Sequence, residues 1–420
     1  MNHKIKTMDT VLNHSVKKLA AVSDRLDGIN EYYFSQKLRQ IDTMNQAGKE
    51  VINLGIGSPD LPPHPDVITT LALEAARPGN HAYQSYKGSP VLREAVSAWY
   101  KKWYNVTLDP ATEVLPLMGS KEGIMHICMT YINKGDGVLI PNPGYPTYKS
   151  AALISGATLN TYTLKEENNW FPNFEELERT DLSGVKLMFV NYPHMPSGKL
   201  PSKDMFEQLI AFAKRNQILI CHDNPYSFIM PGFSDEKSPL SLLSFKGAKE
   251  VVIELNSLSK SHNMAGWRIG FLSGAEERIN EVLRFKSNMD SGMFLPAQLA
   301  AAKALGLDAE WYKHLNSIYD SRRQKAFELL DLLECTYSKD QAGLFVWAAI
   351  PSNYESGFSL SDEVLENGNV FITPGGIFGD AGNQYIRVSL CARENIFEEA
   401  IIRIKESRIT NGKKEENIHN

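Results

Sequence analysis

A lysine in a loop of small polar residues offers the clearest covalent chemistry in the sequence. Lys260 follows the strand-like stretch 251–255, and no apolar periodicity surrounds it. A lysine amine at the end of a strand can form a Schiff base with a carbonyl compound. The hydroxyls of Ser257 and Ser259 and the guanidinium of Arg268 are donors that suit a phosphate group. An ordinary basic loop is an equally good interpretation of these residues alone, because short motifs often match by chance.

Further polar residues lie at the ends of predicted strands, where open α/β sheets bind their ligands. Asp223 closely follows the apolar stretch 218–221, and Tyr226 comes three residues later. A buried carboxylate needs a partner such as a protonated pyridine nitrogen, although a turn residue is the simpler interpretation of a single Asp. Ser120 and Lys121 open a predicted helix after a strand, where backbone amides bind anions. A plain helix cap at Ser120 is the alternative.

Three more residues complete the set of candidates. Asn191 ends the predicted strand 186–190, and Tyr145 offers a ring that could stack on a flat ligand. Arg387 lies inside the apolar strand 385–389 and requires an anionic partner, either a substrate carboxylate or an internal acidic side chain. The histidines near these positions lack the spacing of a metal site, so we predict no metal ion.

The elements that must position these residues alternate between strands and helices. From about residue 51 to residue 272, this alternation predicts an α/β fold with a mostly parallel sheet between two layers of helices. The pattern changes near residue 280, where a long helical region runs to residue 334 with interruptions around Gly292, Pro296 and Gly306. Short strands and a last helix over 394–406 then predict a smaller α+β domain.

Composition and charge narrow the class of protein. The chain has 420 residues, of which 43% are apolar and 22% charged, as in globular proteins. A net charge of -5 favours neither a nucleic-acid partner nor an anionic membrane surface. The sequence has no apolar signal segment and no membrane span, and its four cysteines form no recognisable disulfide framework. We therefore expect a cytoplasmic protein.

The order and spacing of these motifs resemble the fold-type I, class I/II aminotransferases that depend on pyridoxal 5′-phosphate (PLP), over residues 30–405. The resemblance implies that Lys260 forms the Schiff base, Asp223 pairs with the pyridine nitrogen and Tyr226 bonds the ring oxygen, these three being catalytic. It implies substrate binding by Gly57 and by Arg387, the latter through the α-carboxylate. The other implied cofactor contacts are Ser120, Lys121, Tyr145, Asn191, Ser257, Ser259, Arg268 and, from the partner subunit of a homodimer, Tyr83.

The resemblance also implies a domain plan. The large domain would contain a mostly parallel seven-stranded sheet between helices, beside a smaller α+β domain. The expected divisions are a lead (1–30), an arm packing with the small domain (31–65), the large PLP-binding domain (66–300), the small domain (301–408) and a disordered tail (409–420).

One position departs from the family pattern. The family usually has an Asn directly before Pro-Thr-Gly that donates to the ring oxygen of PLP, and this chain has Met195 there. A thioether cannot donate a hydrogen bond. Either Tyr226 alone holds that oxygen, or His194 or Asn191 substitutes. With one donor fewer, the oxygen keeps more negative charge, so we expect the pKa of the imine to be raised.

The function predicted from these observations is transfer of an amino group from an L-amino acid to a 2-oxo acid. Aromatic, methionine-like, aspartate and diaminopimelate-type donors all remain open. A PLP-dependent β-elimination (a C–S lyase) is the alternative on the same scaffold. A non-catalytic PLP-binding regulator ranks lower, because residues 1–30 are too short for a DNA-binding module and the charge is acidic.

Overall fold

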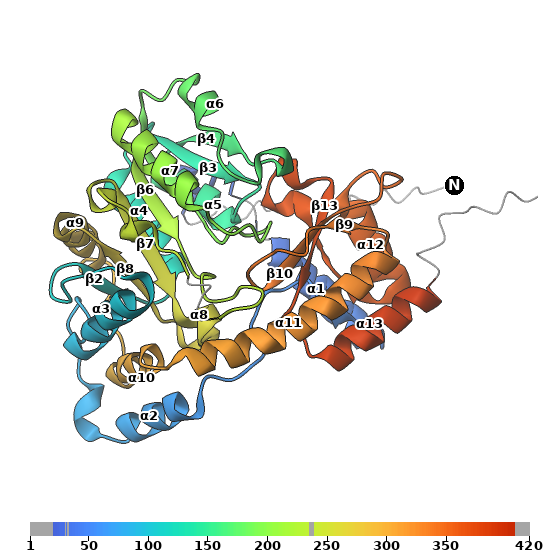
Figure 1. The fold of residues 1–420 in the computed structure, drawn as a ribbon, viewed down its shortest axis with the longest axis horizontal. Helices are drawn as coiled ribbons and strands as arrows, with labels where there is room; N and C mark the ends of the chain where they lie inside the picture. Colours follow the sequence, from blue (N-terminus) through green and yellow to red (C-terminus); the bar gives the residue numbers. More distant parts are fainter. Residues whose placement is uncertain (1–19, 30, 32, 235–238, 408–420) are drawn as a thin grey trace, which may run out of the picture.

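A seven-stranded sheet forms the centre of the larger part of the molecule (Figure 1). The computed structural model describes residues 20–29, 31, 33–234 and 239–407. The predicted tail, 409–420, lies outside the described residues, as does most of the predicted lead. The strands are β2 (Val114–Leu117), β3 (Gly137–Asn142), β4 (Thr158–Thr163), β5 (Val185–Val190), β6 (Leu219–Asp223), β7 (Val252–Ser257) and β8 (Gly270–Gly274).

The sheet has the order β2-β8-β7-β6-β5-β3-β4 and is mostly parallel, as predicted. Only β8 runs antiparallel to its neighbours β2 and β7. Side chains along β5 alternate between two cores, with Leu187 and Phe189 packing into one and Met188 and Val190 into the other. All four are buried, as a sheet covered on both faces requires.

Helices cover both faces of this sheet (Figure 1). Helices α4, α5 and α9 contribute to one core, and α3 and α7 contribute to the other. The helices of this part are α2 (Pro65–Ala75), α3 (Pro90–Tyr104), α4 (Ser120–Tyr131), α5 (Pro146–Ser155), α6 (Phe174–Glu178), α7 (Lys203–Asn216), α8 (Leu258–Ser261), α9 (Glu276–Lys286) and α10 (Leu295–Leu305).

The smaller part is built on an antiparallel sheet of order β12-β13-β10-β9. A separate two-stranded parallel sheet pairs β1 with β11, which connects the N-terminal segment to this part. Its strands are β1 (Ile52–Asn53), β9 (Thr336–Tyr337), β10 (Phe345–Ala349), β11 (Val370–Phe371), β12 (Thr373–Pro374) and β13 (Tyr385–Ser389). Its helices are α1 (Tyr33–Gln46), α11 (Ala309–Leu332), α12 (Gly357–Gly368) and α13 (Glu394–Glu406).

A buried carboxylate fixes the strand that leads to the lysine loop. Glu254, in the middle of β7, accepts hydrogen bonds from Tyr100 Oη at 2.8 Å, Ser241 Oγ at 2.8 Å and the Leu242 amide at 3.0 Å. Its Oε2 also lies 2.7 Å from Nδ1 of His222 on the adjacent strand β6. Removing one partner of a buried charge costs several kcal/mol, roughly 3–5. This network therefore ties β6 and β7 together at the pair His222 and Glu254.

In the described part of the chain, every helix is too short or too polar to cross a lipid bilayer.

Candidate active site

A cavity of about 460 Å³ lies at the carboxyl ends of the central strands. Its walls come from the large sheet, from the loops that follow its strands, and from α1, β10 and β13 of the smaller part. All the residues predicted for the site within one chain line it: Gly57, Ser120, Lys121, Tyr145, Asn191, Asp223, Tyr226, Ser257, Ser259, Lys260, Arg268 and Arg387. Tyr83 does not line this cavity, and 92% of its surface is exposed.

Lys260 lies on the single-turn helix α8, which begins where β7 ends. The side chain of Ser257 caps this turn by accepting a hydrogen bond from the Ser259 amide at 3.2 Å. The Lys260 amine donates to the Gly57 carbonyl oxygen at 2.8 Å. Burial lowers the pKa of the Lys260 amine. A buried amine of this kind is a better proton acceptor near neutral pH than an exposed lysine.

Asp223 is the last residue of β6 and is only 5% exposed. Tyr148 donates a hydrogen bond to Oδ2 at 2.8 Å. Oδ1 is buried and has no hydrogen-bond partner among the described residues. Burial raises the pKa of this carboxyl to about 6. Because buried polar atoms are almost always paired, Oδ1 is a fit for a cationic N–H donor such as a protonated pyridine nitrogen.

Positive groups and hydroxyls gather at the opposite end of the cavity, around the start of α4. Gly119 has φ 88°, and a Cβ there would lie 2.1 Å from Nη2 of Arg268, so only glycine fits. Arg268 contacts Ser259 Oγ at 3.4 Å, and Ser257 Oγ donates to the same oxygen at 2.9 Å. Burial and the charge of Arg268 lower the pKa of Lys121. Two cations near a helix N-terminus suit a phosphate dianion.

Arg387 lies in the middle of β13 and is 4% exposed. Its Nη2 donates to the Gly55 carbonyl oxygen at 2.9 Å, and Nη1 lies 3.4 Å from Met195 Sδ. The guanidinium carbon is 3.7 Å from the ring centre of Phe345. A Cβ on Gly57 would lie 2.1 Å from that same ring, which explains the glycine. The arginine is thus held flat beside the cavity, with geometry suited to a carboxylate.

Asn191 and His194, the two residues considered as substitutes for the donor missing at Met195, lie in different surroundings. Asn191 lines the cavity, but its amide donates to the Asp223 carbonyl oxygen at 2.6 Å, and its oxygen accepts from the Met195 amide at 2.8 Å. His194 is buried, lies 2.7 Å from Ser197 Oγ and does not line the cavity. Burial raises the pKa of Tyr226, so its hydroxyl keeps the proton that it needs to donate.

Sequence reasoning missed several residues that line the cavity. Tyr148, which bonds Asp223, lies one helical turn after Tyr145, and that spacing was the available signal. Phe345 begins β10 and Phe378 ends the short turn Gly375–Phe378, and their residue types alone gave no sign of the site. Phe34 belongs to the helical arm, whose contact with the cavity depends on tertiary packing.

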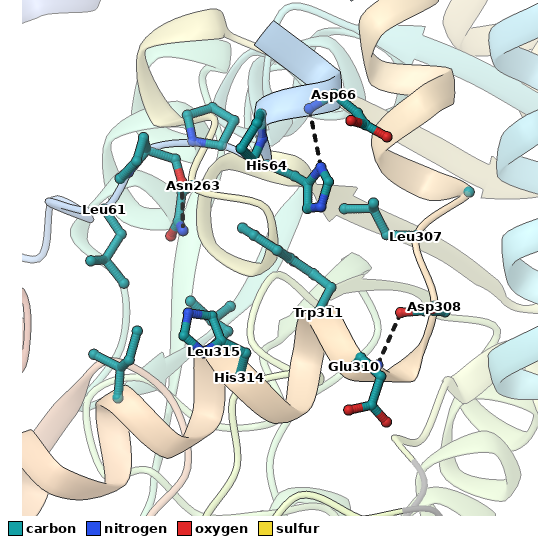
Figure 2. A pocket seen from close by; sticks show the side chains of 15 residues that line it. Leu61, His64, Asp66, Asn263, Leu307, Asp308, Glu310, Trp311, His314 and Leu315 are labelled. Atoms are coloured by element: carbon teal, nitrogen blue, oxygen red, sulfur yellow. Dashed lines mark hydrogen bonds between the residues drawn. The ribbon is translucent and has the colours of Figure 1, made fainter. Parts of the chain in front are cut away.

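A second cavity, of about 680 Å³, lies between the loop 61–66, Asn263 and the start of α11 (Figure 2). Trp311 on its wall donates to the Ser261 carbonyl oxygen at 2.8 Å, and Asn263 donates to Pro62 at 3.2 Å. It is larger than the first cavity, but none of the predicted site residues lines it. The candidate chemistry therefore belongs to the smaller cavity.

One cluster of side chains in the described residues has the composition of a metal site. Atoms of Glu122, His126 and Asp290 lie within 4.8 Å of one another. Lys286 Nζ already lies 2.8 Å from Asp290, and His126 lies 2.7 Å from Glu122. These contacts form an ion-paired network, which is the ordinary arrangement of such groups inside a protein.

Comparisons of the sequence and of the fold with known proteins both point to one family. Residues 49–404 match the family described as aminotransferase class I and II. An LL-diaminopimelate aminotransferase of Dehalococcoides mccartyi (strain CBDB1) is 39% identical over 91% of this chain and 98% of its own. The enzyme of the same name from Halothermothrix orenii is also 39% identical, over 92% and 98%.

Solved structures agree with this assignment. Apo-BacF from Bacillus subtilis superposes with a TM-score of 0.88 at 36% identity, over 92% of this chain and 98% of its own. An aminotransferase from Staphylococcus aureus superposes with a TM-score of 0.83 at 28% identity, over 93% and 100%.

These matches confirm the predicted family, the fold-type I architecture and the PLP cofactor, and they do not favour β-elimination. The chain therefore belongs to the class I and II aminotransferases, which are PLP-dependent enzymes that transfer amino groups.

Proposed function

We propose that this enzyme moves the amino group of an L-amino acid to a 2-oxo acid with Lys260 as the residue that both carries the cofactor and transfers the proton. The observation that supports this most directly is the meeting of the buried Lys260 amine and the unpartnered Asp223 oxygen in one cavity. When bound, PLP accepts the electron pair that remains after the α-proton leaves.

The cations and hydroxyls around the start of α4, which we call the phosphate end of the cavity, would anchor the cofactor. Arg268 and Lys121 supply positive charge, and Ser120, Ser257 and Ser259 supply hydroxyl groups. The amides at the start of α4 add donors and the positive end of a helix dipole. Fixing the phosphate here would fix the orientation of the ring within the cavity.

Around the ring, Asp223 would hold a proton on the pyridine nitrogen, because a carboxylate in a low-dielectric site pairs strongly with a cation. Tyr226, kept protonated by burial, would donate to the ring oxygen. Tyr145 lines the same cavity and would stack on the ring face. Tyr148 holds Asp223 from the other side, at Oδ2.

The amino acid would place its α-carboxylate on Arg387, which is oriented by Gly55 and Phe345. The lowered pKa of Lys260 favours the neutral amine. That amine would take the proton from the α-carbon of the substrate and later donate it on the cofactor side of the substrate nitrogen. The curated relatives are named for LL-diaminopimelate, which makes this compound one candidate donor.

Replacing Lys260 by Ala should lower the turnover of amino-group transfer by at least about 1,000-fold, because the amine that transfers the proton is lost. The exposed Lys246 provides a matched control, and Lys246→Ala should keep normal turnover. Both variants are measured over many cycles with a set of amino donors and a 2-oxo acid. Multiple turnover by the Lys260 variant at the normal rate would refute the assigned role.

Replacing Met195 by Asn should restore a donor to the ring oxygen. We expect the absorbance of the bound cofactor to titrate roughly one pH unit higher in the wild type than in Met195→Asn, because the wild-type oxygen keeps more charge. Ile402→Asn, on an exposed side chain of α13 outside the cavity, controls for a general effect of introducing an Asn. A wild-type midpoint equal to or below that of Met195→Asn would contradict the role given to Met195.

We further propose a homodimer with shared active sites. Large apolar side chains are exposed at Tyr83, Tyr86, Met289 and Phe294. The segment around Tyr86 lies beside the segment that follows α9, because Lys286 Nζ donates to the Tyr86 carbonyl oxygen at 3.4 Å. Such a patch is typical of an interface. Sedimentation of the purified enzyme should give twice the mass of one chain. Tyr83→Phe should weaken retention of the cofactor, because it removes the hydroxyl expected to reach the phosphate in the partner subunit. A monomer of full activity would exclude the proposal.

A cytoplasmic location remains our proposal, supported by four cysteines that are all free thiols. Recovery of the enzyme outside the cytoplasmic fraction of its cells would overturn it.

A further inference from the structure

The end of the active-site cavity that surrounds Arg387 has walls of apolar side chains. We call it the apolar end, and define it by Phe34, Leu38, Ile56, Met195, Phe345 and Phe378. Three of its rings lie around the guanidinium carbon of Arg387, at 3.7 Å for Phe345, 4.6 Å for Phe378 and 5.7 Å for Phe34. A substrate whose carboxylate contacts Arg387 would therefore project its side chain among aromatic and aliphatic groups.

Apart from Arg387 itself, the charged side chains that line the cavity in the described residues are Asp223, Lys260, Lys121 and Arg268, all of which are assigned above to the cofactor. Asp223 is the single carboxylate among the lining residues, and it belongs to the strand end where the pyridine nitrogen would bind. Lys121 and Arg268 lie around the start of α4, where burial and the charge of Arg268 lower the pKa of Lys121. Uncharged polar side chains also line the cavity near these residues, among them Ser35 and Tyr226, whose ring centre lies 6.2 Å from that of Phe345. Beyond the groups assigned to the cofactor and to the α-carboxylate, the described residues of one chain offer a second charged group on the substrate no partner of opposite charge at the apolar end.

Desolvation makes this arrangement selective. A carboxylate or ammonium group that leaves water without a partner is strongly destabilised, whereas an aromatic or branched side chain is stabilised when it is buried. The two effects act in the same direction, and together they favour an uncharged side chain.

We propose, on the basis of the function given above, that the amino donor is a monocarboxylic L-amino acid with an aromatic or large aliphatic side chain. The inference distinguishes this chain from the donor in the names of its curated relatives, because LL-diaminopimelate carries a second ammonium and a second carboxylate. Aspartate and glutamate, with a second carboxylate, are disfavoured for the same reason.

The half-reaction of the intact holoenzyme tests this without the need for an acceptor. The absorbance change of the cofactor is followed after adding L-phenylalanine, L-leucine, L-glutamate or LL-diaminopimelate alone. We expect the rate constant per unit concentration to be about 100-fold or more larger for phenylalanine or leucine than for the two charged donors. A preference for LL-diaminopimelate or glutamate would overturn the inference and leave amino-group transfer intact.

Binding of unreactive carboxylates provides a second readout that does not depend on turnover. Calorimetry of the holoenzyme should give at least about tenfold tighter binding of 3-phenylpropanoate than of pimelate. If no donor reacts in the half-reaction, the proposed function fails, while this comparison still decides the chemistry of the pocket. Equal binding or a preference for pimelate would contradict the inference.

A matched pair of variants tests the wall itself. Phe34→Ala should weaken binding of 3-phenylpropanoate by about tenfold and leave binding of acetate, which has almost no apolar surface to bury, within about threefold. Ile402→Ala removes an exposed apolar side chain from α13 outside the cavity and should change neither value. Loss of both affinities in equal proportion in Phe34→Ala would show a structural effect and would count against the proposed contact.

Discussion

The active site is organised around one buried carboxylate. Asp223 ends the central strand β6 in surroundings that disfavour its charge, and burial raises its pKa to about 6. Tyr148 bonds one oxygen, and the other has no partner among the described residues. Such an oxygen is stable when it meets a cation. We therefore propose that a positively charged ligand atom completes the site, a requirement that the pyridine nitrogen of the cofactor would meet.

A short N-terminal segment connects the other two functional groups. The Gly55 carbonyl oxygen accepts from Arg387, and the Gly57 carbonyl oxygen accepts from Lys260. The strand before this segment pairs with β11 of the smaller part. Two glycines are needed there because a Cβ at either position would lie within 2.3 Å of an aromatic ring. The segment thus joins the smaller part, which carries Arg387, to the loop that carries Lys260.

Much of this arrangement could be predicted from the sequence, because the ends of apolar strands can be recognised in it. Ligands bind at the carboxyl ends of parallel strands, so Asp223, Asn191 and Ser257 could be assigned to one edge of the sheet. Pro116 lies within β2, which forms at the edge of the sheet, where proline is tolerated. The interruptions noted near residues 292 and 306 separate α9, α10 and α11.

Other features depend on contacts between distant segments and could not be predicted. Strand β8 begins at Gly270, two residues after Arg268, because Arg268 has φ 56° and ends a turn that places its side chain against Gly119. The aromatic wall around Arg387 combines Phe34, Phe345 and Phe378, which are more than 300 residues apart along the chain at the extremes. Their meeting follows from packing of the arm and the small sheet, which local patterns do not encode.

The most direct test of the central claim is to reduce the holoenzyme with borohydride and locate the cofactor on the chain by peptide mass spectrometry. Our account predicts that the cofactor mass is attached to Lys260, in the peptide that contains the loop after β7. Attachment to a different lysine, or active enzyme with no attached cofactor after reduction, would contradict it.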